Sequence, residues 1–272
     1  MKVLAFQGGL GNQIFCYAFY LYMKEKYPNH RIYGLYNKQK LSEHYGLEID
    51  KWFDVQLPPQ RWYATAICGM LYLWKRIVGK TRFVETYRDY CENEDAIAFL
   101  AFKFTNRYFP KKEWIHFKID EEDLSDQNKI TLAKIRSSQS VLIHVRRGDF
   151  LSQRYKKLFE GTCPISYYKQ SILHILREVP NPHFFVFSDD MDWVRNNLKL
   201  PEEADYVDWN VGTNSPIDMF LMSQCKYAII ANSTFSYWSA YLGEEKRLVF
   251  YPEKWNNGVA TPSIFKKEWI HY

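Results

Sequence analysis

A cluster of charged side chains follows one apolar segment and has the residue types that bind a phosphate group. His144-Val-Arg-Arg-Gly-Asp149 comes directly after Ser140-Val-Leu-Ile143, which is typical of a buried strand. Two adjacent guanidinium groups are costly to desolvate without an anionic partner, and an arginine fork matches phosphate oxygens in pairs. Because ligands of open α/β sheets bind outside the carboxyl ends of strands, we expect an anion here. The alternative is a basic surface turn in which Asp149 pairs with Arg147.

Two further segments place small and polar residues between a strand and a helix. Residues 1–6 predict a strand, and Gln7-Gly-Gly-Leu-Gly-Asn12 leads into an aromatic helix over residues 13–27. This loop lacks the spacing of a dinucleotide fingerprint or a P-loop, and glycines also serve tight turns for steric reasons. Farther along, Tyr227-Ala-Ile-Ile-Ala231 predicts a strand and Asn232-Ser-Thr-Phe-Ser236 opens a helix. The positive end of a helix attracts phosphate in both places.

Together these segments resemble the bacterial α-1,2-fucosyltransferases of glycosyltransferase family 11. The resemblance covers residues 7–242 and is carried by four motifs: Gln7-Gly-Gly-Leu-Gly-Asn-Gln-Ile-Phe15, His144-Val-Arg-Arg-Gly-Asp149, Phe187-Ser-Asp-Asp190 and Asn232-Ser-Thr-Phe-Ser-Tyr-Trp238. It implies an α/β fold of GT-B type, with two Rossmann-like halves whose parallel sheets face each other across a cleft. It also implies inverting transfer of L-fucose from GDP-fucose to the 2-hydroxyl of a terminal β-galactoside, in surface-glycan or O-antigen synthesis, without a metal or a bound cofactor.

The resemblance assigns catalytic roles to an arginine and to the glycine loop. Because related fucosyltransferases share His-x-Arg, Arg146 more than Arg147 is expected to neutralise the diphosphate, whose negative charge grows as the fucose C1–O bond breaks. Asp149 would orient an arginine, or would simply cap a turn. From the other half, the glycine loop supplies the residues expected near fucose and acceptor: Gly9, Gly11 and Asn12.

The nucleotide is expected at the ends of three strands. His144 would face the nucleotide or its ribose. One of Asp189 and Asp190 would accept both guanine donors, unless the pair only caps the helix that follows. The β-phosphate would be cradled by hydroxyl and backbone N–H groups of the residues that open the last helix: Asn232, Ser233, Thr234 and Phe235.

An inverting transfer also needs a group that takes the proton from the galactose 2-hydroxyl. The glycine loop contains neither a carboxylate nor a histidine. The candidates elsewhere, Glu43, His44 and Asp89, belong to no motif. A dissociative path with late loss of the proton would lower the demand for a strong base.

Two other functions would use the same residues differently. A metal-dependent glycosyltransferase of another donor class would use Asp190-Met-Asp192 as metal ligands, a short match that is common by chance. A non-catalytic carbohydrate-binding protein would need the aromatic residues but not the phosphate cradles. The basic residues are dispersed along the chain, which argues against nucleic-acid binding.

Composition agrees with an enzyme that binds an anionic substrate. The chain has 272 residues, of which 47% are hydrophobic and 25% charged, as in a globular protein of one large or two small domains. The net charge of +5 favours anionic partners such as nucleotide sugars. Five scattered cysteines without a C-x-x-C pair indicate a reducing compartment. No signal peptide is visible, so we expect a cytoplasmic location.

The order of the expected elements divides the chain into residues 1–137 and 138–272. The first part, the acceptor-side domain, begins strand, helix, strand. It continues through residues 38–118, which look irregular, helical and aromatic and are typical of a substrate-binding insert, and ends in an exposed connecting helix over residues 120–136. The second part alternates strands and helices, which predicts a parallel sheet with right-handed crossovers that holds the nucleotide sugar.

Residues 62–74 are an uncharged, aromatic stretch flanked by Arg61, Lys75 and Arg76. The stretch is too short to cross a bilayer. We favour a buried helix of the N-terminal half. Since basic flanks and interfacial aromatics can dock a helix on an acidic surface, the alternative is peripheral contact with the inner face of the membrane.

Overall fold

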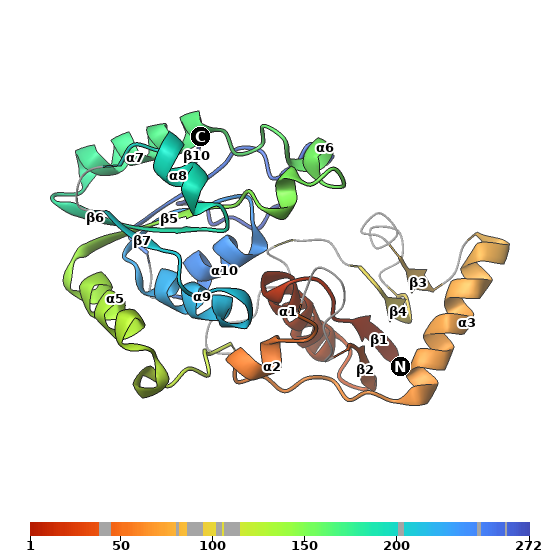
Figure 1. Cartoon of the computed structure of the whole chain (residues 1–272). Coiled ribbons are helices and arrows are strands. Elements are labelled where there is room, and N and C mark those ends of the chain that lie inside the picture. The colour runs from red at the N-terminus through yellow and green to blue at the C-terminus, as the bar shows by residue number, and fades with distance from the viewer. Residues whose placement is uncertain are drawn as a thin grey trace. The chain divides into compact units, whose positions relative to one another are not determined.

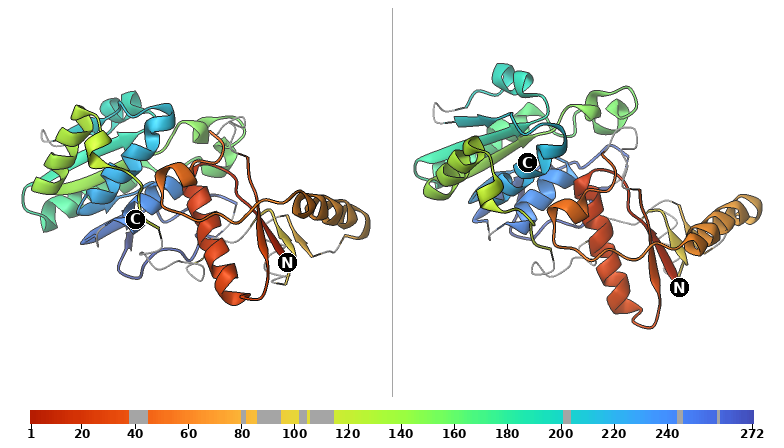
Figure 2. Two further views of the ribbon diagram at one scale, coloured as in Figure 1. Left: turned by 90° about the horizontal axis from the view of Figure 1, so that it is seen from below. Right: turned by 60° about the horizontal axis from the view of Figure 1, so that its bottom comes forward.

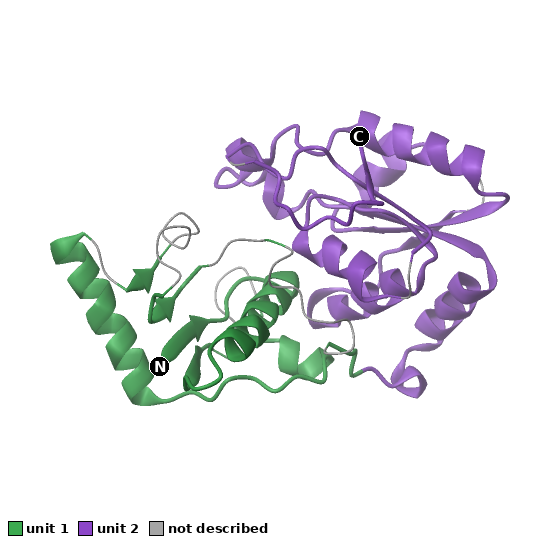
Figure 3. Cartoon of the chain, turned by 180° about the vertical axis from the view of Figure 1, so that it is seen from behind, with its two compact units in different colours: residues 1–118 green, residues 119–272 purple. Residues whose placement is uncertain are grey.

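The computed structural model of the chain forms two compact units, residues 1–118 and residues 119–272 (Figures 1 and 3). The structure describes residues 1–37, 45–79, 82–85, 95–101, 105, 115–200, 204–243, 246–258 and 260–272. Each unit contains one sheet, and all strand pairings within both sheets are parallel. The expected α/β class is therefore confirmed at the level of each unit.

The first unit is a four-stranded sheet with one long helix, α1 or α3, on each side. Its strands pair in the order β2-β1-β4-β3. Their bounds are Lys2–Ala5 for β1, Ile32–Leu35 for β2, Phe83–Val84 for β3 and Ala98–Phe99 for β4. The helices are α1 at Leu10–Lys26, α2 at Ile49–Trp52 and α3 at Trp62–Val78. Figure 2 shows α1 and α3 on opposite sides of the strands; Phe99 packs against Phe19 of α1, and Tyr33 against Tyr63 of α3.

The opening strand, helix and strand are as predicted, but residues 38–118 contain more regular structure than expected. β3 and β4 come from this region and complete the sheet, with β4 paired directly to β1. Each has only two residues, so neither is long enough to show the alternation by which a strand is recognised in a sequence.

The expectation that α3 is a buried helix is wrong. Ala64 and Cys68 are its buried residues, whereas Trp62, Leu73 and Ile77 are 81%, 63% and 77% exposed. The helix packs on the sheet by one narrow face, and the short strands β3 and β4 offer it little surface. Among the residues that the structure describes, no helix combines the length and hydropathy needed to cross a membrane.

The second unit is a six-stranded sheet in the order β10-β9-β8-β5-β6-β7. The strands are β5 at Gln139–Val145, β6 at Pro182–Ser188, β7 at Ala204–Val207, β8 at Tyr227–Ile229, β9 at Leu248–Tyr251 and β10 at Ile270–His271. The helices are α5 at Asp126–Ser137, α6 at Lys156–Phe159, α7 at Ile165–Glu178, α8 at Met191–Asn197, α9 at Ser215–Gln224 and α10 at Thr234–Leu242. In Figure 1, α7 and α8 cover one face of this sheet, and α5, α9 and α10 cover the other.

The alternation of strands and helices predicted for the second part of the chain is confirmed, including the helix that follows Asp189 and Asp190, and the structure adds β7 and β10. The helix expected over residues 120–136 as an exposed connector is α5, and it packs against α9 and β5. Its residues Thr131, Leu132 and Ile135 are buried. Because α5 belongs to the core of the second unit, the division falls between Lys118 and Ile119 rather than after residue 137.

Candidate functional site

The charged motif after β5 meets the end of the neighbouring strand β6. Arg146 Nη1 lies 3.0 Å from Asp189 Oδ2, and its Nη2 lies 2.9 Å from Asp149 Oδ1. A Cβ atom on Gly148 would lie 2.6 Å from Asp189 Oδ2, so a glycine is needed for this close approach. The Arg146 side chain is 31% exposed. A guanidinium has five N–H groups, so these two contacts leave others to donate to a ligand.

Arg147 is held by a different set of groups. Its Nε lies 3.0 Å from Asp190 Oδ2, its guanidinium carbon lies 3.9 Å from the centre of the Trp193 ring, and its backbone N–H donates to Asp189 Oδ1. The alternative pairing of Asp149 with Arg147 is therefore not what the structure shows. Asp149 contacts Arg146 instead.

Asp190 also caps a helix, as the alternative for this residue anticipated. Its Oδ1 accepts the backbone N–H of Trp193 at 3.2 Å, at the start of α8. Both carboxylate oxygens of Asp190 are thus used within the protein, and so are both oxygens of Asp189. Two arginines face three carboxylates in this cluster, so the attraction for an anion must come from the placement of N–H donors rather than from net charge.

His144 lies beneath this cluster and carries no charge at neutral pH. It is 6% exposed. Burial, with a smaller contribution from Arg146, lowers its pKa to about 4 against the opposing effect of Asp189. The His144 ring lies 6.0 Å from the Phe235 ring. Among the described residues, its buried Nδ1 has no hydrogen-bond partner, which leaves one polar atom for a ligand.

The strand before α10 is β8, which pairs with β5. The first turn of α10 therefore lies next to the end of β5. Asn232 is 2% exposed, and its Nδ2 donates to Thr162 Oγ1 and to the Trp255 carbonyl at 2.8 and 2.9 Å. Its Nδ2 therefore ties two loops together, while its buried Oδ1 has no hydrogen-bond partner among the residues that the structure describes. Ser233 makes no side-chain cap. The first N–H groups of a helix lack partners within the helix, so those around Thr234 and Phe235 can serve an anion.

In the first unit, the glycine loop has the geometry of a tight entry into a helix. Gly8 has φ +80°, and a Cβ on it would lie 2.5 Å from Asn12 Nδ2. Gly9 is the N-cap residue of α1, and Gly11 is buried in its first turn. Asn12 is half-buried. The candidate bases Glu43, His44 and Asp89 lie outside the described residues.

Gln13 organises this loop, although its motif gave no reason to single it out. Its Nε2 donates to the carbonyls of Gly8 and Gly46 at 2.9 and 2.8 Å. Its Oε1 accepts the backbone N–H groups of Glu48 and Ile49 at 2.8 and 3.1 Å. The only sequence signal for this clamp is a polar residue within an aromatic helix.

Sequence reasoning also missed a carboxyl group, that of Asp218, in the first turn of α9. Asp218 Oδ1 accepts Asn210 Nδ2 at 2.7 Å, and Asn210 exchanges two hydrogen bonds with Asn128 of α5. Burial, reinforced by the nearby Asp208 charge, raises the pKa of Asp218 to about 7 despite the bond from Asn210. In the sequence this residue looks like an ordinary acid at a helix N-terminus.

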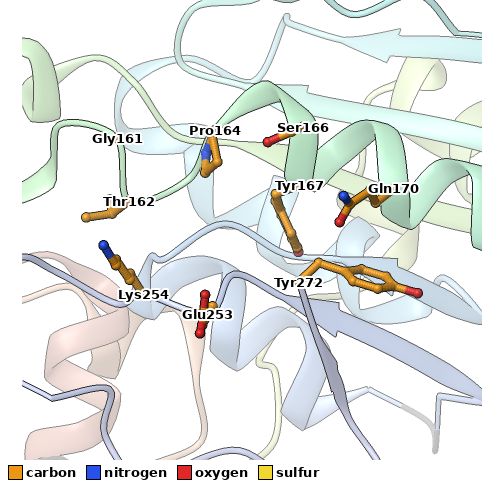
Figure 4. A pocket seen from close by; sticks show the side chains of 9 residues that line it. All are labelled: Gly161, Thr162, Pro164, Ser166, Tyr167, Gln170, Glu253, Lys254 and Tyr272. Atoms are coloured by element: carbon orange, nitrogen blue, oxygen red, sulfur yellow. The ribbon is translucent and has the colours of Figure 1, made fainter.

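A cavity of about 290 Å³ lies at the carboxyl edge of the same sheet, beyond β8 (Figure 4). It is lined by the turn before α7, the first turns of α7, Glu253 and Lys254 after β9, and Tyr272. None of the predicted site residues lines it. Thr162 in its wall receives the hydrogen bond from Asn232, which connects the cavity wall to the start of α10.

Known proteins share this sequence pattern. Residues 99–272 match the profile of the family described as Glycosyl transferase family 11. The O-antigen biosynthesis glycosyltransferase WbnK of Escherichia coli is 34% identical over 57% of this chain and 53% of its own. The alpha-1,2-colitosyltransferase of Escherichia coli is 30% identical over 86% and 85%. The galactoside 2-alpha-L-fucosyltransferase SEC1 of Bos taurus is 27% identical over 57% and 44%. The chain thus spans about half the length of two of these relatives.

Solved structures share the fold. The NodZ alpha-1,6-fucosyltransferase crystal soaked with GDP-fucose superposes with a TM-score of 0.52 at 12% identity, covering 89% of this chain and 92% of that one. The fucosyltransferase NodZ from Bradyrhizobium gives 0.51 at 11% identity, with the same coverage. The expected GT-B type of fold, with two Rossmann-like halves, is confirmed.

Proposed function

Because the chain belongs to glycosyl transferase family 11, we propose that it transfers L-fucose from GDP-fucose to the 2-hydroxyl of a terminal β-galactoside, with inversion, in the synthesis of a surface glycan. The α-1,2 linkage is the one named for the Escherichia coli colitosyltransferase, and the 2-position of a galactoside is the one named for the Bos taurus enzyme. The observation that carries the proposal is the arginine cluster at the carboxyl edge of the second sheet.

The diphosphate binds between Arg146 and the first turn of α10. As the bond between fucose C1 and the phosphate oxygen breaks, negative charge grows on the leaving diphosphate. Arg146 already has its guanidinium fixed by Asp149 and Asp189, so it meets this charge without reorganising, which is the condition under which such donors are most effective. The N–H groups around Thr234 and Phe235 add the positive end of α10.

We expect the neutral His144 to face the nucleotide, because its buried Nδ1 can exchange a hydrogen bond with the donor substrate. An uncharged ring adds no further positive charge beside Arg146. Because burial holds the pKa of His144 near 4, this state persists across the neutral range.

Guanine presents two adjacent N–H donors that fit one carboxylate. Asp189 and Asp190 would have to give up contacts to the arginines or to α8 in order to accept them. We therefore assign this role to Asp218. α9 and α10 pack side by side and both begin at the carboxyl edge, so Asp218 lies at the same edge as the α10 first turn. Two guanine donors would stabilise its ionised form.

Loss of the acceptor proton follows the formation of cationic character at fucose C1. In the glycine loop of the first unit, Asn12 stands in the first turn of α1, and its amide is the group we place near fucose and acceptor together with the backbone of Gly9 and Gly11. An amide can orient a hydroxyl but cannot take its proton at neutral pH, so Asn12 is a positioning residue, and the proton passes to solvent water as the new C1–O bond forms.

One observation supports GDP-colitose as a second candidate donor. Of the relatives named above, the alpha-1,2-colitosyltransferase matches the largest share of this chain. Colitose is fucose without its 3-hydroxyl, so the same diphosphate and guanine contacts would serve both donors. A site built to hydrogen-bond the 3-hydroxyl would discriminate strongly against the deoxy sugar, because its polar groups would be left unpaired.

The test is a transfer assay with GDP-fucose and GDP-colitose against a panel of β-galactosides, with the product linkage read by NMR. We expect an α-1,2-linked product on galactose, with GDP-fucose preferred. Equal or better use of GDP-colitose would assign the second donor. A product linked through another hydroxyl, or no product with either donor, would contradict the proposal.

A further inference from the structure

α3 presents an apolar stripe to solvent along its whole length. It is formed by six residues: Trp62, Ala66, Met70, Leu73, Trp74 and Ile77. Their successive spacings of four, four, three, one and three positions place them on one face of a helix. All six are exposed, with Met70 at 61% and Trp74 at 57%. Exposed apolar patches of this continuity mark surfaces that bind something. We call this surface the α3 stripe.

The charged residues of α3 itself, and the residue just before it, are all basic. α3 contains no acidic residue. Arg61 is exposed just before its first turn. Near its end, Lys75 Nζ lies 3.5 Å from Glu85 and Arg76 Nη2 lies 3.0 Å from the same carboxylate. The Arg76 side chain nevertheless stays 58% exposed beside Glu85, so a basic group is open to solvent near each end of the helix.

We propose that the α3 stripe docks α3 in the plane of an anionic phospholipid membrane. A helix with an apolar face, basic flanks and aromatic residues binds at the headgroup boundary with its axis parallel to the surface. The Trp62 and Trp74 indoles suit this boundary, since such rings carry an apolar body and one polar N–H. Arg61 and Arg76 add attraction to acidic lipid headgroups.

The charge pattern favours lipid over a second copy of the chain. Pairing two α3 stripes antiparallel would bring Arg61 of one copy toward the Lys75 and Arg76 end of the other. Like charges would then meet at both ends; α3 itself supplies no acidic residue, and Glu85 is already engaged by Lys75 and Arg76 of its own copy. An acidic bilayer satisfies the same cations without this repulsion.

Vesicle sedimentation tests the proposal. The full chain is mixed with vesicles of phosphatidylcholine alone or of phosphatidylcholine with phosphatidylglycerol, and the bound fraction is measured. The test variant is Leu73→Ser with Ile77→Ser, which removes two apolar groups from the stripe. The matched control is Leu173→Ser with Leu176→Ser, because these leucines of α7 are also exposed, at 54% and 45%. Circular dichroism and thermal unfolding verify that both variants fold.

Wild type and the α7 control should bind vesicles that contain phosphatidylglycerol and bind those without it much less. The α3 variant should bind roughly tenfold or more weakly, because lipid affinity scales with buried apolar area. Arg61→Gln should bind severalfold more weakly, and added salt should weaken binding by wild type.

Three results would overturn the proposal. One is failure of the wild type to bind acidic vesicles, and another is equal binding by the α3 variant and wild type. The third is a dimer of the wild type in sedimentation velocity that the α3 substitutions abolish, without vesicle binding, which would assign the stripe to a second copy. This test uses no nucleotide or sugar, so its outcome is separate from that of the proposed transferase activity.

Discussion

Arg146 stands between two carboxylates while about a third of its side chain stays open to solvent. Asp149 and Asp189 hold two of its nitrogens from different sides, and the planar guanidinium still has donors for phosphate oxygens. A lysine at this position has one compact charge with three donors and cannot span both carboxylates and a ligand at once.

Arg146→Lys should therefore lower kcat/KM about 10²–10³-fold, as removal of a single preorganised donor to a developing oxyanion does. The free energy of unfolding should change by no more than about 1 kcal/mol, since the pairs are partly exposed. Arg136→Lys is the control, because Arg136 forms a two-pronged contact with Glu121 on the opposite edge of the sheet. Wild-type turnover in Arg146→Lys would remove Arg146 from the mechanism.

Asp218 should make the folded protein less stable as the pH rises. Its pKa is about 7 in the folded protein, against 3.8 for an ordinary aspartate. Between these values the folded chain binds more protons than the unfolded chain, so the free energy of unfolding falls as the pH increases. Asp218→Asn removes this slope. At pH 8 it should be more stable than wild type by roughly 1–4 kcal/mol, a difference that vanishes near pH 4.

Denaturant unfolding between pH 4 and pH 8 measures this effect, with Asp126→Asn as the control, because Asp126 is an exposed acid in the first turn of another helix, α5. The prediction is wrong if Asp218→Asn and wild type show the same pH slope. The same variant should also bind GDP more weakly in calorimetry, and unchanged GDP affinity would return guanine recognition to Asp189 or Asp190.

At the scale of elements, the start of α1 depends on a single side chain. Gln13 holds the loop at Gly8 and the segment at residues 46–49 through four hydrogen bonds, and it is 1% exposed. This clamp fixes the loop that places Asn12. The helix N-terminus at Gly9 has no side-chain cap, so Gln13 is what anchors this turn.

Gln13→Leu should lower the free energy of unfolding by roughly 2–5 kcal/mol, because it leaves two buried N–H groups without acceptors and two carbonyls without donors. Gln127→Leu is the matched control, since Gln127 is exposed on α5, and it should change stability by no more than about 0.5 kcal/mol. Denaturant unfolding of both variants makes the comparison. A loss in Gln13→Leu no larger than in the control would show that the clamp does not hold the loop.

For the whole molecule, the proposed chemistry needs no divalent ion. In the proposed mechanism, Arg146 and the first turn of α10 would supply the donors for the diphosphate from the second unit alone. The alternative ligand pair of Asp190 and Asp192 would require Asp190 to leave Arg147 and the α8 cap. Fucosyl transfer should therefore persist at its full rate in excess EDTA, measured beside a manganese-dependent transferase as a positive control for chelation. Loss of activity that Mn²⁺ restores would favour the metal-dependent mechanism.

The sequence alone determined most of the second unit. β5 and β6 are buried on both faces, so they appear as unbroken apolar runs. Helices of this unit carry their own start signals, such as Pro164 before α7 and Pro216 in α9. β7 escaped detection because three of its four residues are half-exposed, and β10 because it has two residues. Local pattern suffices only where an element is long and its burial is uniform.

Tertiary structure decided which charged groups meet. Arg146 and Asp189 are far apart in the sequence and come together because β5 and β6 are parallel neighbours. No local pattern could show that Asp189 and Asp190 would form ion pairs with arginines. Nor could one show that Asp218 would be buried beside Asn210. α3 is the clearest case: its sequence favours a buried helix, with an exposed amphipathic helix as the alternative, and the structure shows the exposed one. The outcome depended on how much sheet was present to cover it, and the two-residue strands β3 and β4 cover little.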